Sequence, residues 1–212
     1  SGGISIEVEK HIPVAAGLAG GSTDAAGVLR GLNEMFSAGF TDTQLASMGE
    51  KLGADVPFCV YRGTYLAEGI GEKLTALPAC PDCYILLAKP DISVSTGWVY
   101  QSLDFSKPMK HPDIAGQICA LETGDLKDLC SRMGNLLQTV TIPAHPVVAT
   151  IRDSMLEDGA INAMMSGSGP TVFGIFQTEM QANEAASRIK QQGIARDILL
   201  TRPYQIEPER RK

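Results

Sequence analysis

The sequence predicts an α+β fold built from two units, and the order of its strand and helix patterns is the basis for this prediction. In the first half, apolar residues alternate over 4 to 9, two helical patterns follow, and an apolar run over 58 to 61 is typical of a buried strand. The second half ends in the order strand, helix, strand. We place the boundary near Gly63, so that the two expected domains span 1–62 and 63–212.

The two helices of the first half have recognisable ends. The first is expected to begin in the polar triplet 22–24, where each residue is a suitable N-cap, and to end near Gly39. The second is expected to begin after Thr41, whose hydroxyl can form a capping box with Gln44. Both helices carry apolar residues at three- and four-residue spacing, which predicts one buried face on each.

The remaining elements follow from apolar runs and turn residues. Strands are expected over 64–67 and 73–77, and the Gly-containing turn 68–71 separates them. Further along, we expect strands over 84–88, 171–176 and 197–202, helices over 95–103, 113–122, 125–138, 146–158 and 179–192, a loop over 104–113 and a frayed polar tail after Tyr204.

Composition excludes several classes of function. The net charge of −6 and the pI near 5.1 argue against a general nucleic-acid-binding protein, because such proteins concentrate lysine and arginine. No apolar run approaches the roughly 20 residues that cross a bilayer, and the first residues lack the pattern of a signal peptide. We therefore expect a cytoplasmic protein whose partners include neither nucleic acid nor a membrane. Composition does not indicate the oligomeric state, and we expect a monomer or weak homodimer.

The five cysteines suit reduced thiols better than a disulfide framework, because their number is odd. Cys80 and Cys83 form a single CxxC pair, which could bind a metal, act in redox chemistry or only mark a turn. A zinc site usually needs four ligands, and the three histidines lie far away in the sequence. The turn is therefore the favoured interpretation.

A glycine-rich loop precedes the first helix and predicts an anion site. Gly17, Gly20 and Gly21 let the backbone approach a ligand, and the helix behind them offers unpaired N–H groups at its positive end. Ser22 and Thr23 add hydroxyls suited to a phosphate oxygen, and Ser22 is also a candidate ligand for Mg²⁺. The alternative is a connector in which glycines only allow close packing. P-loop, dinucleotide-binding and protein-kinase motifs do not occur in the sequence.

The segment from Pro13 to Ala26 resembles the second motif of the GHMP superfamily of small-molecule kinases. Ala15 stands where many members carry glycine, a departure that should leave the loop intact if its φ is negative. The resemblance implies that the ATP phosphates are bound by Pro13, Val14, Ala15, Ala16, Gly17, Leu18, Ala19, Gly20, Gly21, Ser22 and Thr23.

Gly53-Ala-Asp55-Val-Pro57 resembles the segment that carries the family's catalytic aspartate. Asp55 is then the candidate base that accepts the proton of a substrate hydroxyl, in a reaction that otherwise depends on positioning and charge stabilisation. An aspartate that only caps a turn is the alternative.

Two further segments match the family. Residues 163–173 resemble its third motif, in which Ser166, Gly167, Ser168 and Gly169 would support the phosphate loop, either by direct contact with the ligand or by a structural role alone. Val94-Ser-Thr96 resembles a segment at the substrate-facing edge of one branch of the family, which makes Thr96 a candidate substrate contact.

The resemblance also implies a fold and a reaction. The expected fold is a two-domain GHMP kinase fold, with a ribosomal protein S5 domain 2-like N-terminal part and a ferredoxin-like C-terminal part. The branch with the Val-Ser-Thr segment uses ATP and Mg²⁺ to phosphorylate the 2-hydroxyl of 4-diphosphocytidyl-2-C-methyl-D-erythritol in non-mevalonate isoprenoid biosynthesis. Alternatives are a homoserine or mevalonate type of GHMP kinase, and a non-catalytic nucleotide-binding module on the same fold.

Family members also carry an upstream strand with a Pro-Ala-Lys-x-Asn motif, which supplies a catalytic lysine, and this motif does not occur in the sequence. We therefore expect the N-terminal strands of the fold to be missing and the chain to be inactive alone. Lys10 lies just before the glycine loop and cannot be equated with that lysine, so we expect it to be a solvated residue at a sheet edge.

Overall fold

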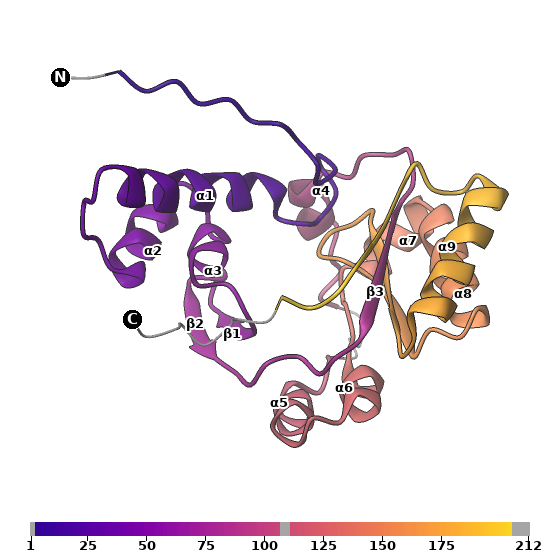
Figure 1. Cartoon of the computed structure of the whole chain (residues 1–212). Helices are drawn as coiled ribbons and strands as arrows, with labels where there is room; N and C mark the ends of the chain where they lie inside the picture. Colours follow the sequence, from indigo (N-terminus) through magenta and orange to yellow (C-terminus); the bar gives the residue numbers. More distant parts are fainter. Residues whose placement is uncertain (1–2, 107–110, 205–212) are drawn as a thin grey trace. The chain divides into compact units, whose positions relative to one another are not determined.

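The computed structural model describes residues 3–106 and 111–204, which form two compact units (Figure 1). The first unit contains the chain up to Val14, Ala19–Tyr61 and Ala67–Leu74. The second unit contains Ala15–Leu18, Arg62–Leu66 and the chain from Thr75 onward. The glycine-rich loop is therefore shared between the units. The expected domain boundary near Gly63 remains a proposal.

Three helices make up most of the first unit: α1 (Gly20–Met35), α2 (Asp42–Glu50) and α3 (Val56–Tyr61). Helix α3 packs against both α1 and α2. The predicted capping box of α2 is confirmed, because Thr41 Oγ1 accepts from Gln44 N at 3.3 Å and Gln44 Oε1 accepts from Thr41 N at 2.9 Å. A small core results, formed by Ala26, Leu45, Ala46, Val56 and Val60.

Two predictions for the first unit are wrong. Residues 4–9 form no strand, and Ile4, Ile6 and Val8 are about half exposed, because none of the described residues pairs with them and alternation alone does not supply ladder hydrogen bonds. The apolar run 58–61 belongs to helix α3 rather than to a strand. Periodicity cannot separate a short buried helix from a strand, and Pro57 is tolerated in the first helical turn.

Helix α1 begins earlier than the triplet 22–24 predicts. Its N-cap is Ala19, whose φ of 49° is left-handed and whose side chain makes no capping bond. The carbonyl of Ala19 instead accepts from Thr23 N at 2.9 Å and from Thr23 Oγ1 at 3.0 Å. The Thr23 hydroxyl is thus used within the first turn of the helix.

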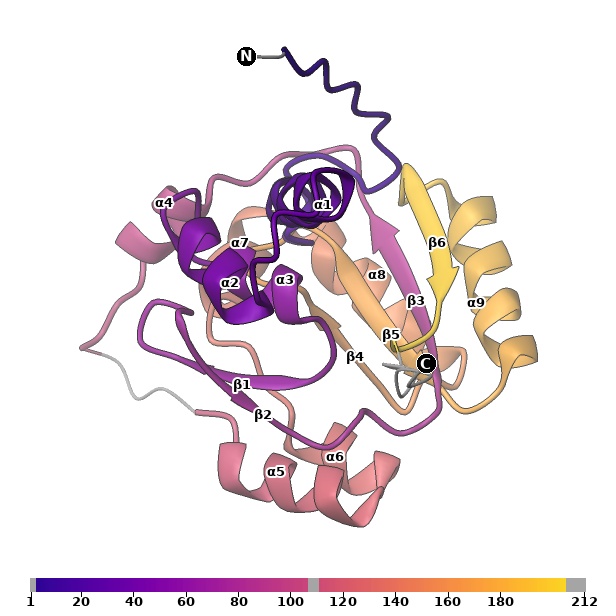
Figure 2. The ribbon, with the colours of Figure 1, turned by 60° about the vertical axis from the view of Figure 1, so that its left-hand side comes forward.

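The second unit is built on an antiparallel sheet of four strands: β3 (Tyr84–Lys89), β4 (Asn162–Met165), β5 (Val172–Phe176) and β6 (Asp197–Thr201). Their order is β4-β5-β3-β6, so β3 is central as predicted (Figure 2). Helix α8 (Val147–Glu157) packs on β4 and β5, and α9 (Glu179–Gln192) packs on β3 and β6, both on the same face of the sheet (Figure 1). This arrangement is the predicted ferredoxin-like one.

A continuous apolar core lies between this sheet and the two helices. Its largest fully buried side chains include Phe176, Leu86, Ile151, Met155, Met165 and Ile189. Leu86 on the central strand pairs with Gly174 of β5 and with Leu200 of β6, which fixes the register on both sides. Gly174 is required here, because a Cβ at this position would lie 2.8 Å from the Met155 sulfur.

The other elements connect these parts. The predicted hairpin is confirmed as β1 (Tyr65–Glu68) and β2 (Lys73–Ala76), and the helix after Ser95 is confirmed as α4 (Thr96–Gln101). Helices α5 (Ile114–Thr123), α6 (Leu126–Arg132) and α7 (Gln138–Ala144) follow.

Two predictions in the second unit need correction. The helix expected over 125–138 ends at Arg132, because the backbone at Met133 is extended and the chain enters the connection 133–137. Strand β4 was not predicted, because it has only four residues and such a short strand gives a weak alternation signal. Part of the expected loop over 104–113 and the tail after Tyr204 lie outside the described residues. Within the described ranges, no helix has both the length and the apolar character needed to cross a membrane.

Candidate active site

The residues predicted to bind ATP are divided between the two units, so each part is described by itself. Pro13 and Val14 belong to the first unit, as do residues 19–23, whereas Ala15–Leu18 belong to the second unit with the third motif. Asp55 lies in the first unit and Thr96 in the second.

In the first unit, the two glycines at the start of α1 differ in the space around them: Gly21 is open, whereas Gly20 is closely packed. A Cβ on Gly20 would lie 3.1 Å from the Ile12 side chain, whereas a Cβ on Gly21 would meet nothing within 4 Å. Gly21 is also exposed. This end of the 16-residue helix therefore offers accessible N–H groups and the positive end of a helix dipole.

Lys10 is exposed, as the sequence predicts, but it lies at no sheet edge, because residues 4–9 form no strand. Its ammonium group pairs with Asp24 of helix α1, and each of the two side chains is about one-third exposed. The pair holds the segment before the glycine loop against the helix that follows it. Because the pair is partly exposed, water screens it and its contribution to stability is small.

Asp55 lies just before α3 and is exposed. One turn further along, Cys59 Sγ lies 3.6 Å from Thr23 Oγ1 of helix α1. Burial raises the pKa of the Cys59 thiol, and the nearby negative charge of Asp55 raises it further, while the bond to Thr23 acts in the opposite direction. Cys59 thus connects the aspartate with the helix behind the glycine loop. The sequence analysis did not single out Cys59, and only its position four residues after Asp55 could have indicated that the two residues are neighbours on a helix.

The backbone of the loop is more strained than expected. Ala15 has a φ of 52°, so the condition of a negative φ does not hold, and Ala19 is also left-handed with a φ of 49°. Both are alanines in a region that favours glycine. We conclude that surrounding contacts, rather than local preference, hold the loop in this shape.

In the second unit, the second and third motifs meet directly. Ser166 Oγ donates to the carbonyl of Gly17 at 2.8 Å. A Cβ on Gly17 would lie 2.4 Å from the Ser166 carbonyl oxygen, and its φ is 71°, so only glycine fits this close approach. The third motif therefore contacts Gly17 through both the hydroxyl and the main chain of Ser166.

Thr96 and the third motif also meet. The hydroxyls of Thr96 and Ser168 lie 2.8 Å apart, and Ser168 is buried. Ser95, as predicted, is the N-cap of α4, where its hydroxyl accepts from Trp98 N. The predicted substrate residue is therefore bonded to the turn that supports the phosphate loop.

The sequence analysis missed a set of residues that hold this turn. Asn135, Gln138 and Thr141 bond to its main chain and recur at three-residue spacing. Only the three-residue spacing of polar residues within 135–141 could have indicated them. This stretch was not recognised as one element, because the expected helix over 125–138 ended inside it.

Neither the CxxC pair nor the lining of two hollows of the molecule includes a predicted site residue. Cys80 shares a hydrogen bond with Cys83, which lowers the pKa of Cys80 and raises that of Cys83, and burial raises the pKa of Cys130 to about 11. Among the described residues, no group of three or more His, Cys, Asp or Glu side chains could hold a metal ion.

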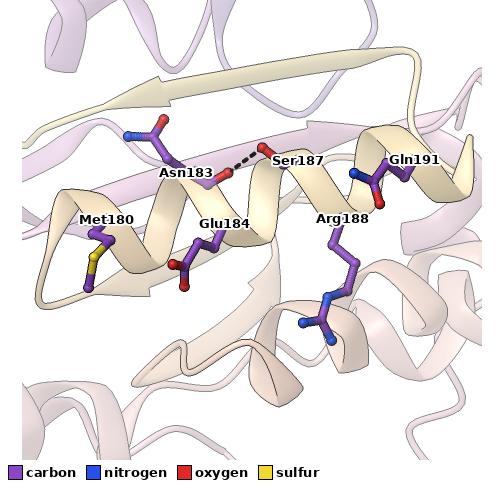
Figure 3. Close-up of a pocket in the computed structure, with 6 residues that line it drawn as sticks. All are labelled: Met180, Asn183, Glu184, Ser187, Arg188 and Gln191. Carbon is purple, nitrogen blue, oxygen red and sulfur yellow. Dashed lines mark hydrogen bonds between the residues drawn. The ribbon is translucent and has the colours of Figure 1, made fainter.

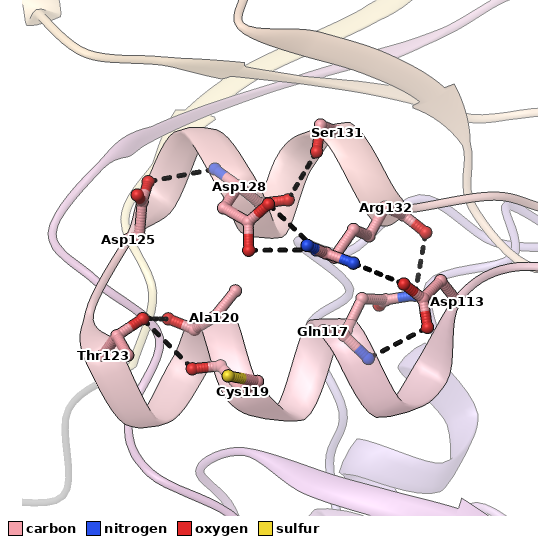
Figure 4. A network of polar contacts seen from close by, with 10 residues as sticks. Asp113, Gln117, Cys119, Ala120, Thr123, Asp125, Asp128, Ser131 and Arg132 are labelled. Atoms are coloured by element: carbon pink, nitrogen blue, oxygen red, sulfur yellow. Dashed lines mark hydrogen bonds and ion pairs between the residues drawn. The ribbon is translucent and has the colours of Figure 1, made fainter.

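One hollow of about 530 Å³ lies along α9, and all of its lining residues come from that helix (Figure 3). Another of about 320 Å³ is lined in part by Asp113 and Arg132. Arg132 Nε donates to Asp128 at 2.9 Å, while its Nη1 pairs with Asp113 (Figure 4). The hydrogen bond from the Gly116 N–H lowers the pKa of the Asp113 carboxyl, and the hydrogen bond from Arg132 lowers it further. These contacts bind α5 to α6 and leave the guanidinium charge already paired.

Comparison with known proteins identifies the family. The family model "GHMP kinases N terminal domain" matches residues 2–63, and "GHMP kinases C terminal" matches residues 118–195. A 4-diphosphocytidyl-2-C-methyl-D-erythritol kinase from Lachnospira eligens is 52% identical over 96% of this chain and 70% of its own length. The chain belongs to the GHMP kinases, in the branch of the 4-diphosphocytidyl-2-C-methyl-D-erythritol kinases. The same-named protein from Enterococcus faecalis is 48% identical over 94% of this chain and 70% of its own length.

Solved structures agree with this assignment. The crystal structure of a 4-(cytidine 5'-diphospho)-2C-methyl-D-erythritol kinase has a TM-score of 0.76 at 29% identity, covering 92% of this chain and 68% of that one. A homoserine kinase from Cytophaga hutchinsonii has a TM-score of 0.75 at 18% identity, with the same coverage of 92% and 68%, and shows the shared fold alone. The predicted two-domain GHMP kinase fold is confirmed.

Proposed function

We propose that the protein transfers the γ-phosphoryl group of ATP to the 2-hydroxyl of 4-diphosphocytidyl-2-C-methyl-D-erythritol. The observation that carries the proposal is 52% identity with a kinase of that name over nearly the whole chain. The homoserine and mevalonate alternatives lose support, because four solved structures of homoserine and mevalonate kinases are only 15 to 20% identical to this chain. An exposed carboxylate at Asp55 favours an enzyme over a binding module.

In the proposed mechanism, Asp55 accepts the proton of the 2-hydroxyl as the new oxygen–phosphorus bond forms and the bond to ADP breaks. Phosphoryl transfer needs little covalent chemistry from the protein, so positioning and charge stabilisation supply most of the effect. The N–H groups at the start of α1 would stabilise negative charge on the phosphates. Gly21 gives them room, and the tight contact between Gly17 and Ser166 keeps the loop in place.

ATP supplies the phosphoryl group, and the residues at the start of α1 fit it because Gly21 is exposed and open. Mg²⁺ prefers oxygen ligands and usually depends on substrate phosphates, and the Ser22 hydroxyl would be its ligand from the protein. The proposal further includes direct contacts of Thr96 with the substrate, a cytoplasmic location, a monomer or weak homodimer, and domains of 1–62 and 63–212.

The activity is tested by ADP release with 4-diphosphocytidyl-2-C-methyl-D-erythritol, homoserine and mevalonate as competing acceptors. Because the chain spans about 70% of the length of its relatives, the assay uses the 212-residue chain and the same chain joined to the upstream part of a relative. Release that depends on the diphosphocytidyl substrate supports the proposal. Release with neither protein, or with homoserine alone, overturns it.

The phosphate site is tested separately by Gly21→Val. The new side chain meets no protein atom at its Cβ, so the helix can accommodate it, and in the proposed site it would obstruct a bound phosphate. Titration calorimetry with ATP and Mg²⁺ should show at least ten-fold weaker binding. Gly31→Val is the matched control, because Gly31 is also exposed on α1 and equally open but lies near the other end of the helix. Equal affinity of both variants would favour a glycine loop that serves packing only.

A further inference from the structure

Asn135 makes three hydrogen bonds, two of them to the third motif, although it lies 30 residues before Met165 in sequence. Its Nδ2 donates to the carbonyls of Met165 and Gly167, both at 2.8 Å. Its Oδ1 accepts from Leu137 N at 2.9 Å. This last bond fixes which end of the carboxamide carries the donors, since only the oxygen can accept. Both donors and the acceptor are therefore used.

Two more side chains from the same stretch complete the set. Gln138 Oε1 accepts from Met165 N at 2.8 Å, and Thr141 Oγ1 donates to the Ser168 carbonyl at 3.1 Å. Thr141 is fully buried. Spacing of three residues brings such side chains to one side of a helical stretch.

The turn itself has only a few internal main-chain bonds. Gly169 N donates to the Ser166 carbonyl at 2.9 Å, and Ser166 N donates to the Thr171 carbonyl at 2.8 Å. Within the described part of the chain, the N–H groups of Gly167 and Ser168 donate to no acceptor. Side chains of 135–141 thus occupy carbonyls of the turn, and the N–H group of the exposed Gly167 is open to an anion, whereas Ser168 is buried.

We propose that Asn135 is a positioning residue for the nucleotide phosphates, acting through the main chain of the Met165–Gly169 turn. The effect reaches the phosphate loop because Ser166 bonds to Gly17, and it reaches Thr96 through Ser168. This inference rests on the proposed function. Gln138 and Thr141 assist by fixing the two ends of the same turn.

The test compares Asn135→Ala and Asn135→Asp with the unmodified protein. Alanine leaves two carbonyls without their donor, and we expect ATP binding to weaken about ten-fold, the effect of losing roughly two net hydrogen bonds. Aspartate keeps the shape but places a carboxylate against two carbonyl oxygens, so it should weaken binding at least as much. A role in packing alone would make the isosteric aspartate the milder change, and calorimetric stoichiometry reports any loss of folded protein.

Asn162→Ala is the matched control. Asn162 is also half-buried in the second unit, and its Nδ2 donates to a carbonyl, that of Cys130, at 2.7 Å, but it does not bond to the turn. The ATP affinity of Asn162→Ala should stay within about two-fold of the affinity of the unmodified protein.

Amide hydrogen exchange at Ser166 and Gly169 reports the turn without any ligand. We expect faster exchange in Asn135→Ala and unchanged exchange in Asn162→Ala. If neither the 212-residue chain nor its extended form binds ATP, the proposed function is wrong, and the exchange result still decides whether Asn135 holds the turn. Unchanged exchange, or faster exchange with full ATP affinity, overturns the positioning role.

Discussion

The two units of the molecule differ in how they are held together. The second unit buries a continuous apolar layer between a four-stranded sheet and two helices. The first unit has three helices around a small core and leaves Met35 and Phe36 72% and 61% exposed. The proposed base lies in the first unit, whereas the turn that supports the phosphate loop lies in the second.

This difference indicates a division of roles. A turn clamped by several side chains gives a fixed reference for the phosphates, because its main chain has few alternatives. A unit with a small core has fewer contacts that resist local opening, so its stability is expected to be lower. Chemistry and stability should therefore respond to different substitutions.

The largest expected effect is on catalysis and comes from the first unit. Asp55→Asn removes the proton acceptor but keeps the shape of the side chain, so kcat should fall about 100- to 10,000-fold. ATP affinity and the unfolding midpoint should change little, because Asp55 is exposed. The measurements are steady-state ADP release and calorimetry.

Asp82→Asn is the control for this change, since Asp82 is a highly exposed carboxylate of the second unit. It should retain full turnover. A kcat for Asp55→Asn close to that of the control would remove Asp55 from the mechanism.

The next effect is on stability and comes from the second unit. Phe176 is fully buried in the core under α8 and α9. Phe176→Ala should lower the free energy of unfolding by about 3 to 5 kcal/mol, which combines lost burial with the cavity that remains. Urea unfolding followed by the fluorescence of Trp98, the single tryptophan, reports this unit. A loss below about 1 kcal/mol would mean that the core is looser than its burial indicates.

A matched pair of substitutions compares the two cores directly. Val148 in the second unit and Val60 in the first are both fully buried. Val148→Ala should cost about 2 kcal/mol, whereas Val60→Ala should cost about 1 kcal/mol, because a small core between three helices relaxes more easily around a cavity. Trp98 fluorescence reports the first of these, and alkylation of Cys59 during urea unfolding reports the second. Equal costs would show that both cores are equally rigid.

The sequence predicted the second unit better than the first, and the reasons are physical. Central strand β3 and helix α9 have strong apolar periodicity and clear ends, such as the left-handed Gly193 after α9. In the first unit, alternation over 4–9 predicted a strand that has no partner among the described residues, and a short apolar run could not distinguish α3 from a strand.

For the site, glycine and motif patterns indicated the loop, Asp55 and the third motif. They could not show how these are held. The bonds from Asn135 and Gln138 depend on residues that are far apart in sequence, and the left-handed backbone at Ala15 is imposed by tertiary contacts rather than by local preference.

The smallest expected effect concerns this strain at Ala15. At a φ of 52°, alanine has a steric strain of about 1 kcal/mol that glycine lacks. Glycine offsets part of this gain, because it has more conformational freedom in the unfolded chain. Ala15→Gly should therefore stabilise the protein by up to about 0.5 kcal/mol. Ala16→Gly is the control, because Ala16 is buried and does not have a positive φ, so the same change should destabilise by about 1 kcal/mol. Urea unfolding of both variants, followed by Trp98, gives the sign of each change. If both substitutions destabilise to the same extent, the left-handed backbone at Ala15 carries no strain, and the contacts around the loop are its preferred state rather than an imposed one.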